Sequence, residues 1–261
     1  MKKRTDILLL LPSLAGFAVF FIVPFIYIFY YAFTENAFSG KFVFFDNFVT
    51  LFKNEYFRLA MKNTFTFSVI AVPLTMIISL IIAALLVKYT SNLPFVKSAF
   101  FIPVILPSAA IIILWNAYFS DFTPTASLLI IFLWKYSGLN IMLIITALAG
   151  MNKDMLDAAK IDGAGWFRTL LNVTLPNIAP TLFFTFILSV VNSFKIFRES
   201  YLLYGNYPSE EVYMLQNYLN NHFEKMNYQN IATAAIFFFI VVYVIVAVLM
   251  HFEKKWSETI W

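Results

Sequence analysis

The sequence predicts an all-α membrane protein with six transmembrane helices. Of its 261 residues, 61% are hydrophobic and only 12% are charged, and the mean hydropathy is +0.80. A soluble domain carries about 25% charged residues, so this chain has roughly half the polar cover that it would need. Six long apolar stretches, only one of them interrupted by a charge, follow one another along the chain. Because about 20 apolar residues cross a bilayer as a helix, each stretch is expected to hold one span.

The six stretches lie between neighbouring charged residues. They are residues 7–34, 63–87, 98–120, 122–152 (interrupted by Lys135), 169–194 and 226–252. The basic residues at positions 2–4 resemble the start of a signal peptide. The apolar stretch that follows exceeds the roughly 7–15 residues of such a leader, however, and no small-residue cleavage site ends it. The first stretch is therefore predicted to be a retained helix, with Pro12 and Pro24 as candidate kink sites.

Lys135 decides where the fourth span begins. A lysine at the centre of a membrane helix costs about 2.5–3.5 kcal/mol on insertion scales. The favoured interpretation starts the span near Tyr136 and leaves residues 126–134 as an apolar outer segment. A buried functional lysine is the alternative. On the favoured interpretation the spans hold no cation, which disfavours an anionic substrate relative to a neutral one.

An even number of spans places both termini on one side, and the basic residues indicate which side. Ten Lys and Arg residues fall in the segments on the side of the N-terminus, and seven fall in the opposite segments. Since Lys and Arg are enriched in cytoplasmic loops, both termini are predicted to be cytoplasmic. The expected organisation is an N-terminal transmembrane helix at residues 1–33, an extracytoplasmic segment at 34–61, a five-helix core at 62–252 with a cytoplasmic loop at 152–178, and a cytoplasmic tail at 253–261.

The inner loop at 152–178 is long and rich in small and polar residues, whereas the link between residues 88 and 97 is short. Asn152 can cap a short helix, and Asp154 lies in its first turn, where the helix dipole favours a carboxylate. Gly163 stands where this helix would end, a position that favours a left-handed residue. A second helix, at about 165–173, would return the chain to the membrane. The predicted structure is a helix–turn–helix elbow.

One face of the first elbow helix consists mostly of small side chains. Met155, Ala158, Ala159 and Asp162 fall at the spacing of a single helical face. Another protein's surface can approach the backbone closely there, so the elbow is predicted to be a docking element. An ordinary amphipathic connector is the alternative.

The elbow closely resembles the EAA motif of permease subunits of ABC importers. In that motif, Glu-Ala-Ala is followed at fixed distances by Gly, Ile and Leu-Pro. The matching residues here are Ala158, Ala159, Gly163, Leu175 and Pro176. Asp157 replaces the Glu and Val173 replaces the Ile. Asp162-Gly163-Ala164 also matches the extended motif of sugar-type permeases.

Further segments are similar to the sugar branch of that family, which includes maltose-type and glycerol-phosphate-type permeases. They are Asp46-Asn47-Phe48, Lys62-Asn63-Thr64, Phe101-Ile102-Pro103 and residues 193–197. The outer stretch at 120–126 is shorter than is common in the family. The resemblance implies the type I importer permease fold in a bacterial-type cell membrane. It also implies a second permease subunit, two ATPase subunits that bind ATP and Mg and grip the elbow, an extracytoplasmic binding protein, and a sugar substrate.

Substrate contacts are harder to place. Thr181, Thr185, Ser189 and Asn192 form a polar stripe on the fifth span, with Ser193 beside it. Such a stripe faces either a water-filled path or another helix, and both interpretations stay open. Weaker path candidates are Tyr136 and Asn140 on the fourth span and Trp115 and Asn116 on the third. The aromatic residues among them are equally typical of an interfacial belt.

The sequence argues against other functional classes. No Gly-x-x-x-x-Gly-Lys-Ser/Thr motif occurs, and Ser39-Gly40-Lys41 is followed by Phe42. Cysteine is absent, and His222 and His251 are isolated, so no metal ligands, catalytic residues or bound cofactor are predicted. Scattered basic residues do not indicate a nucleic-acid partner. A six-helix channel or secondary transporter for a small polar solute is the alternative function, although no charged relay or inverted repeat supports it.

Overall fold

The computed structural model describes residues 2–35, 40–89, 99–119 and 121–260. Their secondary structure is helical apart from an isolated bridge between Thr34 and Phe42. Five helices are long and apolar enough to cross a membrane, at Leu10–Ala32, Glu55–Lys88, Pro124–Ala149, Trp166–Tyr204 and Tyr228–Lys254. The predicted all-α membrane protein is thus confirmed. Most of the predicted short link between residues 88 and 97 lies outside the described residues.

The stretch at residues 98–120, which is predicted to hold one span, does not form one continuous helix in its described part. The described part of this stretch contains two short helices, α6 (Ile102–Ile105) and α7 (Ser108–Tyr118). At the break between them Leu106 is extended, with ψ 135°. Pro107 causes this, because a proline pushes the preceding residue out of the helical region. The 11 residues of α7 reach only about 16 Å, whereas a bilayer core is about 30 Å thick.

The chain forms two compact units, Met1–Arg58 with Tyr218–Val242, and Leu59–Asn217 with Tyr243–Trp261. In the first unit, α1 (Lys2–Phe17), a π-helical turn at Ala18–Ile22 and α2 (Val23–Ala32) follow one another without a gap. In an α-helix the ring of a proline clashes with the carbonyl four residues earlier. For Pro24 this is the carbonyl of Phe20, and Phe20 lies inside the π turn. The wider turn thus coincides with the point where an α-helix would be strained.

The same unit contains α3 (Asp46–Lys53), most of α13 (Leu215–Glu224) and the first part of α14 (Tyr228–Ile260). The Asn47 amide donates hydrogen bonds to the carbonyls of Ala32 and Thr34, at 3.0 and 2.9 Å, and so ties α3 to the end of α2. Ala232 and Ile236 of α14 pack with Ala32 in a buried cluster.

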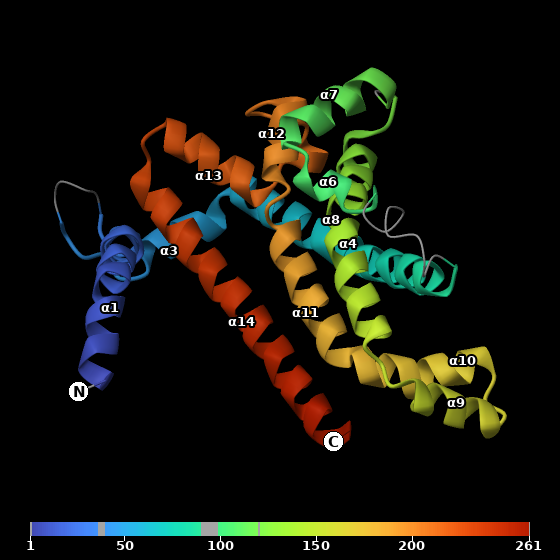
Figure 1. The fold of residues 1–261 in the computed structure, drawn as a ribbon. Helices are drawn as coiled ribbons and strands as arrows, with labels where there is room; N and C mark the ends of the chain where they lie inside the picture. The colour runs from blue at the N-terminus through green and yellow to red at the C-terminus, as the bar shows by residue number, and fades with distance from the viewer. Residues whose placement is uncertain (1, 36–39, 90–98, 120, 261) are drawn as a thin grey trace. The chain divides into compact units, whose positions relative to one another are not determined.

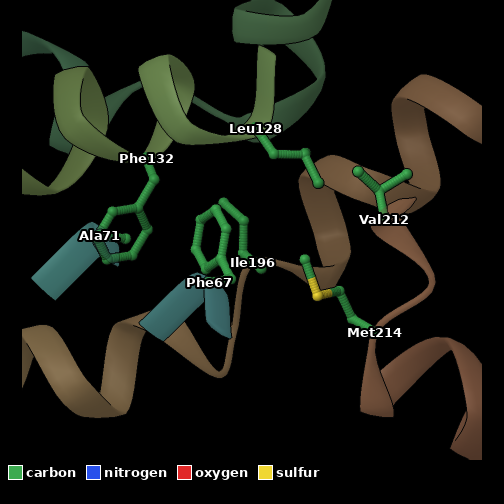
Figure 2. Packing of buried hydrophobic residues seen from close by; sticks show 7 residues of the cluster. All are labelled: Phe67, Ala71, Leu128, Phe132, Ile196, Val212 and Met214. Carbon is green, nitrogen blue, oxygen red and sulfur yellow. The ribbon is translucent and has the colours of Figure 1, made fainter. Parts of the chain in front are cut away.

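The second unit is built around α4 (Glu55–Tyr89), α8 (Pro124–Ala149), α11 (Leu175–Ser193) and α12 (Phe197–Tyr204). Figure 2 shows one of its buried clusters, in which side chains of α4 and α8 meet the segments on either side of α12. The members are Phe67, Ala71, Leu128, Phe132, Ile196, Val212 and Met214. The rings of Phe67 and Phe132 meet edge to face, 5.5 Å apart.

Two close approaches fix α8 and α4 within this unit. A Cβ atom on Gly138 of α8 would lie 2.0 Å from the carbonyl oxygen of Phe100, so only glycine fits there. At the start of α4, the Asn63 amide donates to the carbonyls of Glu210 and Tyr213, at 2.6 and 3.1 Å. The Thr64 hydroxyl accepts from the backbone of Leu215 at 2.9 Å. The segment before α13 is therefore held by polar side chains of α4.

Candidate functional site

The first helix of the predicted elbow is α9 (Lys153–Ile161), and its start has the predicted cap. The Asn152 side chain accepts a hydrogen bond from the Asp154 backbone at 2.9 Å. Asp154 lies in the first turn and Lys160 in the last, as the helix dipole favours. Only Gly150, Met151 and Asn152 separate α9 from the end of α8. The link between α8 and α9 is therefore short.

The turn of the elbow is a Schellman motif centred on Gly163. Gly163 has φ +72°, which confirms the predicted left-handed conformation. The Gly163 N–H donates to the carbonyl of Lys160 at 3.0 Å, and the Ala164 N–H donates to that of Ala159 at 2.9 Å. These two bonds satisfy carbonyls that the helix end would otherwise leave open. The turn thus has a fixed geometry rather than that of a loose loop.

The second elbow helix runs directly into the fifth predicted span. It comprises α10 (Trp166–Thr169), a π-helical turn at Leu170–Thr174 and α11, which begins at Leu175-Pro176. The prediction of a helix at about 165–173 is confirmed, and this helix continues into α11 without a gap. Pro176 resembles Pro24 in this respect. Its ring would clash with the carbonyl of Asn172 in an α-helix, and Asn172 lies inside the π turn. Figure 1 shows α9 and α10 at the same end of α8 and α11.

The predicted small-residue face of α9 is divided in the structure. Ala159 is buried, whereas Met155, Ala158 and Asp162 are exposed. The sequence analysis missed three large apolar side chains beside the turn. These are Ile161, Trp166 and Phe167, which are 86%, 72% and 64% exposed. Exposed apolar side chains gathered at one turn are typical of a contact surface.

The carboxylate of the motif is held by its own helix. The Lys160 ammonium donates to Asp157 Oδ1 at 2.8 Å, and both side chains are largely exposed. This hydrogen bond and the positive charge of Lys160 hold the pKa of Asp157 below its usual range. Asp157 is thus ionised at neutral pH and can accept hydrogen bonds from a partner.

The polar stripe of α11 contacts neighbouring helices. Thr185, Ser189 and Ser193 are buried, and each hydroxyl donates to a carbonyl of its own helix. The Asn140 amide of α8 donates to Ser189 Oγ at 2.7 Å. The Ser193 hydroxyl also lies within hydrogen-bond distance of Ser68 Oγ of α4, at 2.8 Å. These contacts join α11 to α8 and α4, as the packing interpretation expects.

The remaining path candidates are placed differently. Asn192 and Thr181 are half-buried on α11, and Asn116 is exposed at the end of α7. Trp115 is buried in a cluster with Ile111, Ile112 and Ile131, and its ring stacks on Phe119 at 4.9 Å. Tyr136 is half-buried, with its ring 4.9 Å from that of Phe132.

The prediction that the fourth span begins near Tyr136 is wrong. α8 is continuous from Pro124 to Ala149, with Lys135 in its middle. The Lys135 ammonium lies 2.5 Å from a carboxylate oxygen of Glu199 and donates to Ser108 Oγ at 2.8 Å. The carboxylate neutralises the charge of Lys135 and so lowers the insertion cost on which the prediction rested. The sequence analysis missed Glu199 and Ser108, although a lysine inside an apolar stretch indicates that an acidic partner is needed.

Among the residues that the structure describes, no three His, Cys, Asp or Glu side chains gather as metal ligands would. The candidate site residues described above fall into two groups. The elbow is exposed and has a fixed turn, and the buried polar side chains join helices to one another.

The chain matches known proteins over most of its length. A family model for "binding-protein-dependent transport system inner membrane component" matches residues 3–256. The arabinooligosaccharides transport system permease protein AraP of Bacillus subtilis is 27% identical over 78% of this chain and 74% of its own length. The probable starch degradation products transport system permease protein AmyD of Thermoanaerobacterium thermosulfurigenes is 25% identical over 95% of this chain and 93% of its own. The sn-glycerol-3-phosphate transport system permease protein UgpA of Escherichia coli is 29% identical over 72% of each chain.

The fold agrees with that of a solved transporter. A crystal structure of a bacterial alginate ABC transporter in complex with an alginate pentasaccharide-bound periplasmic protein is similar, with a TM-score of 0.77. The similarity covers 97% of this chain and 96% of that chain, at 24% identity. Because the family model spans almost the whole sequence, the chain belongs to the family of binding-protein-dependent transport system inner membrane components, as a multi-pass ABC permease of the bacterial inner membrane whose ATPase is a separate subunit.

Proposed function

We propose that this chain carries a neutral saccharide through the membrane by alternating access, and that its elbow is the joint at which a separate ATPase drives the movement. The observation that supports this most directly is the construction of the elbow. Three residues link α9 to α8, the Schellman turn at Gly163 has a fixed geometry, and α10 continues into α11 without a break. A force on the elbow therefore reaches two long helices at once.

The chemistry of the elbow suits docking on a protein. The elbow exposes the apolar side chains of Ile161, Trp166 and Phe167 and also the carboxylate of Asp157. Apolar and aromatic contact area with polar groups at its rim is typical of a specific protein interface. The proposed assembly contains a second permease subunit, two ATPase subunits that bind ATP and Mg, and an extracytoplasmic binding protein that delivers the substrate. This chain binds no cofactor of its own.

A neutral saccharide fits the charges of the spans better than an anion does. The sequence analysis expected no cation inside the spans, but Lys135 lies within α8. Its charge is neutralised by Glu199, so it does not act as a counter-ion for a sugar phosphate or an acidic sugar. Similar permeases are named for arabinooligosaccharides and starch degradation products, although one is named for glycerol 3-phosphate.

The proposed topology has six membrane segments, the broken α6–α7 segment included, with both termini and the elbow in the cytoplasm. The chain has no cysteine, so the topology can be tested with single cysteines introduced at chosen positions. We expect Lys160→Cys to resist a membrane-impermeant thiol reagent in intact cells and Ser209→Cys to react, since both positions are exposed. After the cells are broken, both should react. Labelling of position 160 but not 209 in intact cells would reverse the orientation and exclude contact between the elbow and a cytoplasmic ATPase.

Asn192 is the member of the polar stripe that we propose to contact the substrate, because it is half-buried and Ser189 and Ser193 are engaged between helices. We expect Asn192→Leu to lower uptake about tenfold or more while complex assembly and basal ATPase activity are kept, as the loss of one buried hydrogen bond would do. Asn140→Leu is the matched control. It removes the bond to Ser189 and should instead reduce the amount of assembled complex. If Asn192→Leu also prevents assembly, the whole stripe serves packing.

A further inference from the structure

Three polar side chains from three separate helices meet inside the second unit. Lys135 lies in the middle of α8, Glu199 in the first turn of α12, and Ser108 is the first residue of α7. Glu199 Oε1 accepts from Lys135 at 2.5 Å and from Ser108 at 2.8 Å, and Lys135 also donates to Ser108 at 2.8 Å. Each of the three residues thus contacts the other two. Glu199 and Ser108 are buried, and the Lys135 side chain is 11% exposed. We call this group the polar cluster.

The polar cluster is not expected to contribute much to the free energy of unfolding. Replacing a buried ion pair by apolar side chains of similar volume is often neutral or stabilising, because two charges must leave water. The carboxylate is also only half satisfied, since Glu199 Oε2 is buried without a hydrogen-bond partner among the described residues. What the cluster does supply is geometry, because directed bonds fix which residue of each helix meets the others.

The helices that the cluster joins have different attachments. α7 begins directly after the break at Leu106-Pro107, and α12 begins after the turn at residues 194–196 that ends α11. Both are short helices that follow an interruption of the helical structure. α8 is continuous, and its far end leads through three residues into the elbow. Figure 1 shows α7 and α12 beside α8, at the end away from α9 and α10.

We propose that Lys135, Glu199 and Ser108 are positioning residues that make α7 and α12 move with α8 during transport. The inference rests on the proposed coupling of the elbow to an ATPase. Movement of the elbow is carried along α8. Apolar contacts with Ile131 already pack α7 against α8, and the polar cluster adds directed bonds that make both short helices follow α8. The cluster therefore affects how much transport each ATP produces, rather than whether ATP is hydrolysed.

The test uses the complete transporter in proteoliposomes, with saccharide uptake and ATP hydrolysis measured on the same sample. Lys135→Met/Glu199→Leu removes both charges together, so that neither is left unpaired. We expect this variant to assemble and to hydrolyse ATP on stimulation by the loaded binding protein, while uptake per ATP falls about tenfold, within the usual range of coupling between sites. Lys135→Arg keeps the charge and the donors and should retain most of the uptake per ATP.

The matched control is Thr75→Val. Thr75 is fully buried, but its hydroxyl donates only to the carbonyl of Ala71 in its own helix, at 2.7 Å. Uptake per ATP should stay normal in this variant. A double variant with normal uptake per ATP would overturn the inference, and so would one that fails to assemble, because the cluster would then serve stability. A failure of the elbow proposal is recognised separately, by normal uptake when the turn at Gly163 is disrupted.

Discussion

Gly163→Val is expected to reduce ATP-driven uptake by at least about tenfold, because it disrupts the turn of the elbow. Gly163 has φ +72°, which a β-branched residue adopts only with strain of about 1–3 kcal/mol. No atom lies within 4 Å of the position where its Cβ would be, so backbone strain is the direct effect of the substitution. Relief of this strain would distort the two hydrogen bonds that close the turn. Uptake and ATPase activity should be measured in the reconstituted complex, with and without loaded binding protein.

Two controls separate the turn from the surface around it. Gly165→Val places the same side chain two residues later, where φ is −66° and the space is also open, and uptake should be retained. Gly163→Asn should keep most of the activity, since asparagine tolerates the left-handed conformation. Equal losses in Gly163→Val and Gly165→Val would assign the effect to the added side chain. Normal uptake in Gly163→Val would remove the elbow from the mechanism.

Glu199→Leu alone is expected to destabilise the protein by about 3–5 kcal/mol, the usual consequence of leaving a buried charge without its partner. Lys135 would lose its carboxylate inside an apolar helix, and the Ser108 hydroxyl would lose an acceptor. The measurement is the amount of folded protein that survives heating of the detergent-solubilised complex, compared with the wild type.

The matched variants test the cause of this loss. Adding Lys135→Met to Glu199→Leu should restore most of the stability, because no charge is then left unpaired. Glu211→Leu, at an exposed acidic residue, should change stability little. If Glu199→Leu is as stable as the wild type, or if the double variant is no more stable than the single one, the ion pair does not neutralise Lys135 as the structure indicates.

The elbow could be predicted from the sequence because local chemistry determines it. An asparagine that caps a helix, an acidic residue in the first turn and a glycine at the end act within a few residues of the backbone that they organise. The predictions for Asn152, Asp154 and Gly163 therefore hold in detail. Four of the six predicted spans were similarly visible as single continuous apolar helices, and in α8 the prediction failed only at the start.

The features that the sequence did not reveal depend on residues far apart in the chain. Lys135 and Glu199 are separated by 64 residues, and no local pattern states which acidic residue will reach the lysine. The same holds for Asn140 and Ser189, which are 49 residues apart and whose contact joins α8 to α11. The break at Leu106-Pro107 did have a local signal. It was overlooked because the apolar stretch at 98–120 is long enough for a span, and length was given more weight than the proline.

The most direct test of the coupling account is a photo-crosslink from the elbow to the ATPase. A benzophenone amino acid in place of Ile161, which is 86% exposed beside the turn, should crosslink to the ATPase subunit in membranes that contain the whole transporter. The same group in place of Ser209, an exposed residue on the other side of the proposed topology, should not. Crosslinking of the ATPase from position 161 alone is the predicted result. Crosslinking from position 209, or from neither position while uptake is normal, would contradict the account.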